Sequence, residues 1–295
     1  MNIRQLQALR AVMETQTTTQ AAEILGVTQP AVSTLIAGLE KSLHIKLFER
    51  SRGRLWPTPE AYRLADEADT VIASFGRMEQ RARKLSELKS GELRLASLPG
   101  PGLQFIPRLL ARFLADKPEV TVHLQVRSSS EIKEWVAAQY LDLGLADLPI
   151  DNPAIHYEVV TMRCVCVVPT GHSLADKKLL TPKDLDNVPF IVLEPGHMTH
   201  TRLAAAFLDY DARLNVRVSV QLFAPACELV ANGAGVSLVD PITAQAHKSD
   251  RLISIPFEPV IPFSIALMTP VGRPLSLLTQ SFLESLKKGF SPYII

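Results

Sequence analysis

Apolar positions recur at helical spacing from the start of the chain. The first of them stand three residues apart, at Ile3, Leu6, Leu9 and Val12. This spacing predicts an amphipathic helix that ends near Glu14. Thr17 and Gln20 then form the pattern of a capping box, in which both side chains satisfy free backbone donors, and they predict a second helix over 18–25. Gly26 ends that helix.

A third helix follows at once. Thr28 stands at its N-cap position and Pro30 lies in its first turn, where a missing amide hydrogen costs nothing. Two short helices joined by a tight turn form a helix-turn-helix, whose second member can lie in the major groove of DNA. We therefore expect Thr28, Gln29, Ser33 and Thr34 to face base edges and phosphates. A small three-helix core without a ligand is the alternative.

A basic hairpin is predicted next. Two short segments that mix apolar and basic residues flank Ser51-Arg52-Gly53, which indicates two strands and a tight turn. Arg50, Arg52 and Arg54 then gather at the tip. Arginines on an exposed loop beside a recognition helix are well placed to bind phosphates or to enter the minor groove. The pattern therefore predicts a winged helix-turn-helix over residues 1–58.

The helix that follows is unusually long. Thr58 caps it, Pro59 takes its first position and Glu60 lies in its first turn. Its apolar residues alternate steps of four and three, at Leu64, Ala68, Val71, Phe75, Met78, Ala82 and Leu85. A narrow seven-residue seam between charged faces predicts a coiled-coil contact between two copies over 59–89. Packing of the seam on its own domain is the alternative.

From about residue 90 the pattern changes to alternating strands and helices. Expected strands and helices of the first unit lie at 93–97, 105–113, 120–126, 131–139 and 141–146. A second such unit runs from Val159 to Val239. The alternation predicts parallel sheets with crossover helices, arranged as two α/β lobes with a cleft between them.

Ligands of such sheets settle at the carboxyl ends of strands, close to the amino ends of the following helices. The loops at these places hold Ser97, Pro99, Gly100, Ser129, Ser130, His197, Thr199, Thr201 and Asp240, which are our candidate effector-binding residues. Asp147 joins them, because it ends a predicted strand and would face an ammonium group in the cleft. Asp147 and Asp240 fit turn capping as well, and Ser128–Ser130 fit helix capping equally well.

Composition narrows the possible classes of protein but does not by itself indicate a function. The chain has 47% hydrophobic and 21% charged residues and a net charge of +1, which is typical of a folded protein. Cys164 and Cys166 stand too close on one strand for a disulfide and lack companion zinc ligands, so they and Cys227 are expected to be buried free thiols. His197 and His200 are too few for a metal site. We expect no metal and no cofactor.

The sequence shows neither the pattern of an export signal nor that of a membrane-spanning helix. No export signal follows Met1, and no segment holds about 18 apolar residues without charge. We therefore expect a cytoplasmic protein without membrane contact. An enzyme is disfavoured because no nucleophile elbow, phosphate loop or metal signature occurs. A solute-binding transport protein would suit residues 91 onward but would need export, and a basic winged N-terminus has no role there.

Several short motifs together resemble the LysR family of bacterial transcriptional regulators. They are Ala21-Ala22, Thr28-Gln29-Pro30-Ala31-Val32-Ser33, Leu39-Glu40, Leu47-Phe48-Glu49-Arg50 and Pro57-Thr58. The resemblance covers the whole chain, because residues 90–295 are similar to the family's effector domain, which has the fold of type 2 periplasmic binding proteins. We expect lobe I at about 90–161 and 266–295, and lobe II at about 162–265.

This resemblance implies a homodimer through the long helix, paired further into a homotetramer, which binds double-stranded promoter DNA, a small-molecule effector and RNA polymerase. Carried over by position, Gln29, Pro30 and Ser33 face the groove, with Thr17 or Thr19 and the wing arginines on phosphates. The chain departs from the family where basic residues often follow the serine, since positions 28–40 hold none. More of the affinity must then come from the wing and from Lys41 and Lys46.

Within the family, further segments resemble the regulators of lysine biosynthesis and of opine catabolism, among them Glu92–Pro99, Glu134-Trp135 and Gly233–Ala244. That likeness implies a charged, amino-acid-like effector such as diaminopimelate, lysine or an arginine derivative. A small carboxylate or another metabolite is the alternative.

Overall fold

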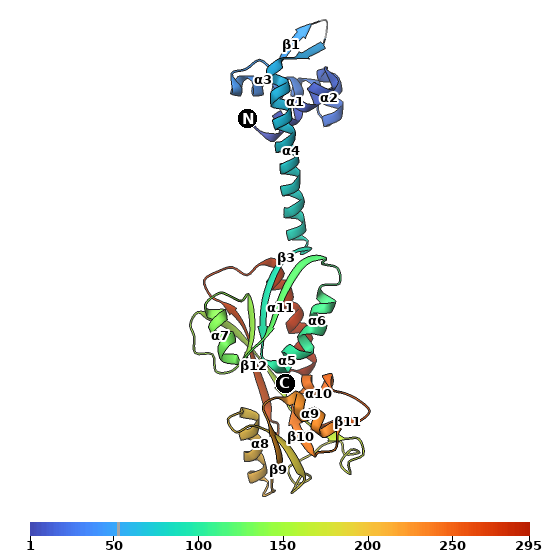
Figure 1. Cartoon of the computed structure of the whole chain (residues 1–295), viewed down its shortest axis with the longest axis vertical. Helices are drawn as coiled ribbons and strands as arrows, with labels where there is room; N and C mark the ends of the chain where they lie inside the picture. Colours follow the sequence, from blue (N-terminus) through green and yellow to red (C-terminus); the bar gives the residue numbers. More distant parts are fainter. Residues whose placement is uncertain (52–53) are drawn as a thin grey trace. The chain divides into compact units, whose positions relative to one another are not determined.

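Three short helices pack around one apolar core at the start of the chain in the computed structural model, which describes residues 1–51 and 54–295. The helices are α1 (Ile3–Thr15), α2 (Thr18–Leu25) and α3 (Gln29–Leu43), as Figure 1 shows. Leu9, Val12, Ala21, Val32 and Leu39 are almost completely buried where the helices meet. All three predicted helices are confirmed, because local capping and apolar spacing set their limits.

The caps of these helices differ in detail from the sequence-based prediction. The Thr17 hydroxyl accepts the N–H of Gln20 at 3.3 Å, but the Gln20 side chain bonds that hydroxyl instead of the Thr17 N–H. The capping box is therefore only half formed. Thr28 lies at the N-cap position of α3, but its side chain makes no capping hydrogen bond. Gly26 ends α2 with φ 63°, a left-handed conformation that favours glycine.

The basic hairpin is present as strands β1 (Phe48–Ser51) and β2 (Arg54–Pro57), which pair antiparallel with Ser51 opposite Arg54. Arg52 and Gly53 of the predicted tip lie outside the described residues. Helix α4 (Pro59–Ser86) follows, and the N–H of Ala61 donates to the Thr58 hydroxyl at 3.3 Å, so Thr58 caps this helix as expected.

The apolar seam of α4 is divided between two environments. Ala68 is 2% exposed and Leu64 packs against the three-helix core, so the first turns are covered by their own domain. Val71, Phe75 and Met78 are 48%, 36% and 60% exposed. Packing on the same domain therefore holds for the first turns of the helix, because only they reach the core of residues 1–86, and a contact between two copies stays a prediction for the exposed remainder.

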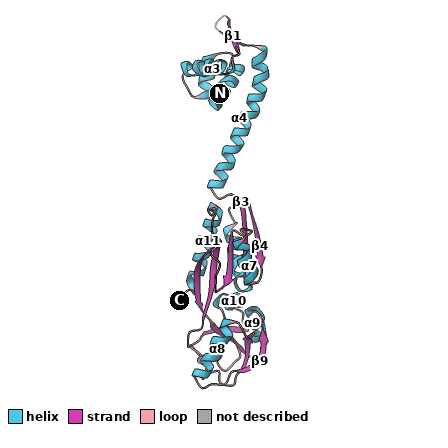
Figure 2. Cartoon of the chain, turned by 90° about the vertical axis from the view of Figure 1, so that its left-hand side faces the viewer, coloured by secondary structure: helices cyan, strands magenta, loops and turns pink. Residues whose placement is uncertain are grey.

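Residues 87–295 form a second unit made of two five-stranded sheets, one in each lobe (Figure 2). Lobe I contains β3 (Ser90–Ser97), β4 (Glu119–Val126), β5 (Leu143–Asp147), β6 (Ile155–Arg163) and β12 (Pro262–Pro270) in the order β4-β3-β5-β12-β6. Its helices are α5 (Pro99–Leu103), α6 (Phe105–Phe113), α7 (Ser129–Ala137) and α11 (Leu277–Phe290).

Lobe II repeats this arrangement. Its strands are β7 (Val165–Pro169), β8 (Pro189–Leu193), β9 (Asn215–Val220), β10 (Val236–Val239) and β11 (Leu252–Pro256) in the order β11-β7-β10-β8-β9. Its helices are α8 (Met198–Asp209), α9 (Phe223–Ala231) and α10 (Pro241–Ala246), and a short 3₁₀ helix, η1 (Ser291–Tyr293), ends the chain.

The two-lobed α/β prediction is confirmed, but each of the sheets predicted as parallel is mixed. In lobe I, β4, β3 and β5 run parallel, whereas β12 pairs antiparallel with both β5 and β6. In lobe II, β7 pairs antiparallel with β10 and β11. The physical reason is connectivity, because the chain leaves lobe I through β6 and returns through β12. These two strands run slightly past the limits expected for lobe I, since β6 ends at Arg163 and β12 begins at Pro262.

Three chemical features complete the fold. Cys164, Cys166 and Cys227 are buried and free, as expected. Within residues 1–51 and 54–295 no group of three or more His, Cys, Asp or Glu side chains is arranged to hold a metal ion. In the same described residues no single helix is long and apolar enough to cross a membrane, although α2 and α3, bent by 102°, together reach that length and composition.

The close packing of α7 on β5 leads us to predict how a substitution there changes the free energy of unfolding. A Cβ on Gly144 would lie 2.6 Å from Val136 and 2.8 Å from Ile132, both completely buried. We expect Gly144→Ala to lower the free energy of unfolding by about 1–3 kcal/mol, because the helix must move outward. Urea unfolding followed by fluorescence measures this. Gly171→Ala, where the new Cβ meets open space, is the control and should change the free energy by less than about 0.5 kcal/mol. Equal urea midpoints for the two variants would contradict the close packing.

Candidate DNA-binding surface and effector cleft

A groove of about 300 Å³ lies between the wing and the first turns of α2 and α3. Four of the expected DNA-binding residues line it, namely Thr17, Gln29, Arg50 and Arg54. A second groove of about 680 Å³ shares Thr18 and Arg50 with the first and adds Ser33. The structure thus brings polar side chains of three separate elements onto one concave surface.

Gln29 is held in a defined orientation on this surface. Its side-chain nitrogen donates to the hydroxyls of Thr18 and Ser33, each at 2.9 Å. Thr18 was not among the candidates drawn from the sequence, because its position inside α2 gave no local signal. The contact joins the two helices of the motif and fixes the direction of the Gln29 amide before any DNA is bound.

Several other predicted contact residues lie elsewhere on the surface. Thr34 lines a different groove, with Arg4 and Val27, on the other side of α3, and its hydroxyl donates to the Pro30 carbonyl at 2.9 Å. The side chains of Thr34 and Ser33 therefore face different grooves, although the two residues are neighbours in the chain. Thr19, Thr28 and Pro30 are exposed on the surface. Arg52 falls outside the described residues.

Glu40 fastens the wing to the recognition helix. One of its carboxylate oxygens accepts the N–H of Leu47 at 2.8 Å and the N–H of Phe48 at 3.2 Å. The other oxygen lies 3.5 Å from the Lys46 ammonium group, and the Glu40 side chain is only 14% exposed. Charge-assisted bonds to backbone donors are strong and directional. Glu40 therefore sets where β1 begins relative to α3, a role that the sequence did not reveal.

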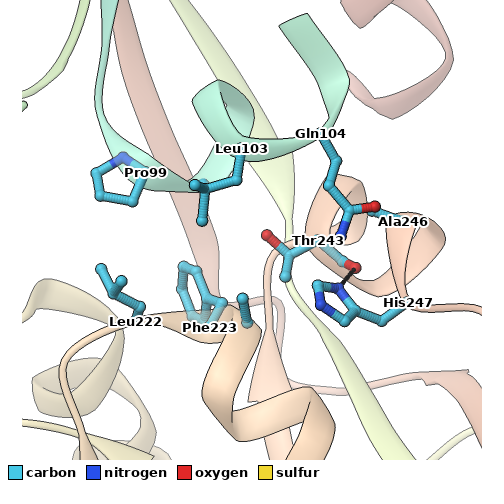
Figure 3. A pocket seen from close by; sticks show the side chains of 10 residues that line it. Pro99, Leu103, Gln104, Leu222, Phe223, Thr243, Ala246 and His247 are labelled. Carbon is cyan, nitrogen blue, oxygen red and sulfur yellow. Dashed lines mark hydrogen bonds between the residues drawn. The ribbon is translucent and has the colours of Figure 1, made fainter. Parts of the chain in front are cut away.

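The junction of the two lobes encloses a small pocket, shown in Figure 3. Lobe I contributes Pro99, Gly100 and Leu103 from α5, and lobe II contributes Leu222 and Phe223 from the loop and first residue of α9. The open space measures about 10 Å³, which is room for about one water molecule. The apolar side chains of α5 and of the start of α9 therefore pack close together in this conformation.

Ser129 and Asp147 form a pair at the strand ends of lobe I. The Ser129 hydroxyl donates to the Asp147 carboxylate at 3.1 Å and accepts the Asp147 N–H at 3.0 Å. Ser128 instead caps α7 in a full capping box with Glu131, and Ser130 bonds the Ser128 hydroxyl. The serine cluster thus divides into capping residues and one residue, Ser129, that orients the acid.

His197 is a candidate effector-binding residue of lobe II. It is the N-cap residue of α8, and its Nδ1 accepts the N–H of Thr199 at 3.2 Å. Its ring forms a three-ring cluster with Phe223 and Phe263, edge-on to Phe223 at a centroid distance of 5.5 Å and stacked on Phe263 at 6.3 Å. Burial lowers the pKa of His197, and the nearby charge of Asp147 partly opposes that shift. His197 is therefore a hydrogen-bonding group of lobe II whose pKa responds to the acid of lobe I.

The remaining candidates are buried or turned to solvent. Ser97 is completely buried and its hydroxyl donates to the Leu98 carbonyl at 2.9 Å. Thr201 is exposed on α8. Asp240 is completely buried at the N-cap of α10, where one carboxylate oxygen accepts the N–H groups of Ile242 and Thr243. Asp240 therefore does cap a helix, but this uses only one of its two oxygens.

Two family models match the chain. The "Bacterial regulatory helix-turn-helix protein, lysR family" matches residues 3–62, and the "LysR substrate binding domain" matches residues 86–291. The "Transcriptional activator protein LysR" of Escherichia coli (strain K12) is 36% identical over 290 residues, covering 98% of this chain and 93% of that protein. The "Octopine catabolism/uptake operon regulatory protein OccR" of Rhizobium meliloti is 35% identical over 257 residues, covering 87% of this chain and 85% of that protein.

Solved structures show the same fold. CbnR, a LysR family transcriptional regulator solved in complex with its target DNA, superimposes with a TM-score of 0.70 at 23% identity, covering 98% of this chain and 100% of CbnR. The matched family models, the full-length relatives and this shared architecture agree with one another. The chain belongs to the LysR family of bacterial transcriptional regulators, which are not enzymes.

Proposed function

We propose that this protein is a homodimeric, sequence-specific DNA-binding regulator whose effector is a basic or diamino acid bound between the two lobes. The observation that carries the DNA-binding part is the shared concave surface between the wing, α2 and α3. Gln29 and Ser33 lie on it beside Arg50, so groups suited to base edges adjoin a cation suited to phosphates. Such a protein acts where the chromosome is, which supports a cytoplasmic location and contact with RNA polymerase.

The exposed stripe of α4 supports the dimer. Val71, Phe75, Met78 and Leu85 are all at least a third exposed, at 48%, 36%, 60% and 48%. Their spacing is that of a coiled-coil seam, and a second copy of the same helix is the partner that matches such a seam along its length. Two copies then offer two recognition helices to an interrupted palindrome.

The pair of Ser129 and Asp147 supports a cationic effector. Asp147 is half-buried, and its carboxylate is held in place by Ser129 on the side of the lobe junction where His197 lies. An ammonium group bonds such an oriented carboxylate more strongly than a neutral donor does. The relative named for octopine catabolism and uptake makes an amino-acid-like effector the natural class to test. Binding would change the lobe arrangement and so the spacing of the paired DNA-binding domains.

The dimer is tested on α4. Met78→Glu places a charge in the proposed seam, and we expect the mass measured by size-exclusion chromatography with light scattering to fall to that of one chain. Promoter affinity should fall by about 100-fold or more, because two linked half-site contacts become one. Gln80→Glu, an exposed substitution away from the seam on the same helix, is the control and should remain dimeric. A dimeric Met78→Glu variant would place the interface elsewhere.

The wing is tested by salt dependence. Arg50→Ala should weaken binding to promoter and random duplex alike and should reduce the slope of log K against log salt by about 0.9, the value for one lost phosphate contact. Glu40→Ala should reduce the slope as well, although Glu40 carries no positive charge, because the wing loses its anchor.

A double-mutant cycle separates positioning from general destabilisation. If Glu40 acts through the wing, the combined Glu40→Ala and Arg50→Ala variant will lose less affinity than the sum of the single losses. Glu23→Ala, an exposed acid of α2 outside both grooves, should leave the salt slope unchanged. Additive losses with an unchanged slope for Glu40→Ala would refute the positioning role.

The effector cleft is tested with L-lysine and isothermal titration calorimetry. Asp147→Asn should weaken lysine binding by about 1 kcal/mol or more, because a charge-assisted hydrogen bond becomes a neutral one. Ser129→Ala should weaken it in the same direction, since the acid loses its orientation. Asp151→Asn, an exposed acid just beyond the same strand, is the matched control. Unchanged affinity in Asp147→Asn would remove this residue from the site.

A further inference from the structure

A groove lined by cations lies where α6 and α11 of lobe I meet α10 of lobe II, and η1 completes its wall (Figure 1). Its volume is about 410 Å³, which is in the range of small-molecule sites. Among the described residues, none of the candidate effector-binding residues lines it. The groove is therefore separate from the site proposed for the effector.

Three basic side chains line this groove. Arg108 and Arg112 stand four residues apart on α6, and Lys288 lies in the last turn of α11. All three are exposed. Arg108 donates to the Gln104 side-chain oxygen at 3.2 Å, whereas Arg112 and Lys288 have no hydrogen bond or ion pair within residues 1–51 and 54–295. No acidic residue in that part of the chain lines the groove, so its positive charge is left to an anion from outside.

The residue next to Lys288 shows the contrast. The Lys287 ammonium group lies 2.7 Å from the carboxylate of Glu158 on β6 and 3.9 Å from that of Glu284 on α11. The end of α11 therefore carries one lysine that is neutralised inside the protein and one that faces the groove without a counter-charge.

The rest of the groove wall is mostly apolar. Phe105 packs on Phe290 at a centroid distance of 4.6 Å and meets Tyr293 edge-on at 6.4 Å. Phe105 and Tyr293 are half-buried and line the groove from lobe I and η1, while Ile242 and Ala246 line it from lobe II. Sites with apolar walls and a few charged groups bind organic ligands that have a charged head and an apolar body.

From this arrangement we infer that the groove binds a small organic phosphate, that is, a phosphate monoester with an apolar body. Such a monoester carries a charge of about −1.5 to −2 at pH 7 and has three acceptor oxygens. The forked donors of two arginines bind phosphate oxygens in pairs, and a lysine adds a point charge. The inference goes beyond the proposed function, because it requires neither DNA nor the effector of the cleft.

Both lobes contribute to this site. Arg112 and Lys288 belong to lobe I, whereas Gln245 lines the groove from α10 and is exposed. A ligand in the groove therefore touches both lobes, and a negative charge at position 245 would repel the phosphate from the side of lobe II.

Calorimetry on the full-length chain at fixed ionic strength tests the class of ligand. The probes are phenyl phosphate, phenylacetate, which keeps the ring with a single charge, and inorganic phosphate, which lacks the ring. We expect phenyl phosphate to bind at least tenfold more tightly than either other probe, because only it fills the apolar wall and meets all three cations. Equal binding of phenyl phosphate and inorganic phosphate, or no binding of phenyl phosphate, overturns the inference.

Substitutions locate the site. Arg112→Gln and Lys288→Gln should each weaken phenyl phosphate at least fivefold, and Gln245→Glu, which is nearly equal in size, at least tenfold. Lys287→Gln is the matched control, because it removes the same charge from the next residue, which does not line the groove. We expect it to leave the affinity unchanged.

Two results would place the ligand elsewhere. Equal losses in Lys287→Gln and Lys288→Gln would indicate general attraction to a basic surface and would overturn the site. A loss in Asp147→Asn as large as that in Lys288→Gln would place phenyl phosphate in the cleft. If all variants lose promoter binding but keep these differences in phenyl phosphate affinity, the groove stands while the proposed DNA-binding function fails.

Discussion

The chain passes between the lobes of its second unit twice, and this connectivity decides what the unit can do. Because β6 and β12 belong to one sheet and β7 and β11 to the other, the exit and return strands run antiparallel to their neighbours. The passage is braced where the Arg163 guanidinium donates to the Phe257 carbonyl at 3.1 Å and pairs with Glu258. The carboxyl ends of the parallel strands of both sheets then face one junction. Polar loops that are far apart in the sequence become the two walls of a single cleft.

Two acids at that junction show how burial separates residues that look alike in the sequence. Asp147 is half-buried and its carboxylate is satisfied by the Ser129 hydroxyl, so it is an oriented acceptor that still reaches solvent. Asp240 is completely buried, and burial raises its pKa above the ordinary value for a carboxyl group. Desolvation disfavours the charged form, and the hydrogen bonds from Thr243 and Ile242 only partly oppose this effect.

In the first unit, residues 1–86, short helices hold a polar surface in place. Apolar side chains of the wing pack into the three-helix core, and directional bonds add to this packing. Glu40 accepts the N–H groups of Leu47 and Phe48, and the N–H of Leu55 donates to the Gln16 carbonyl at 2.9 Å. On the facing side, Gln29 bonds Thr18 and Ser33, which joins α2 to α3. The residues proposed to read DNA are therefore positioned by a polar network as well as by the core, in which Leu47, Phe48 and Leu55 of the wing are buried.

Sequence by itself determined the local features of this protein. The limits of α1, α2 and α6, the cap at Thr58 and the hairpin followed from apolar spacing and capping chemistry, because these depend on residues only a few positions apart. The short motifs of residues 21–58 were also enough to indicate the family. Only the tertiary structure decided the mixed strand directions and which part of the apolar seam of α4 is buried. It also decided that Thr34 and Ser33 face different grooves. The same holds for the bond between Ser129 and Asp147, the anchoring of the wing by Glu40 and the complete burial of Asp240, because each depends on which distant segments are packed together and on how much water that packing excludes.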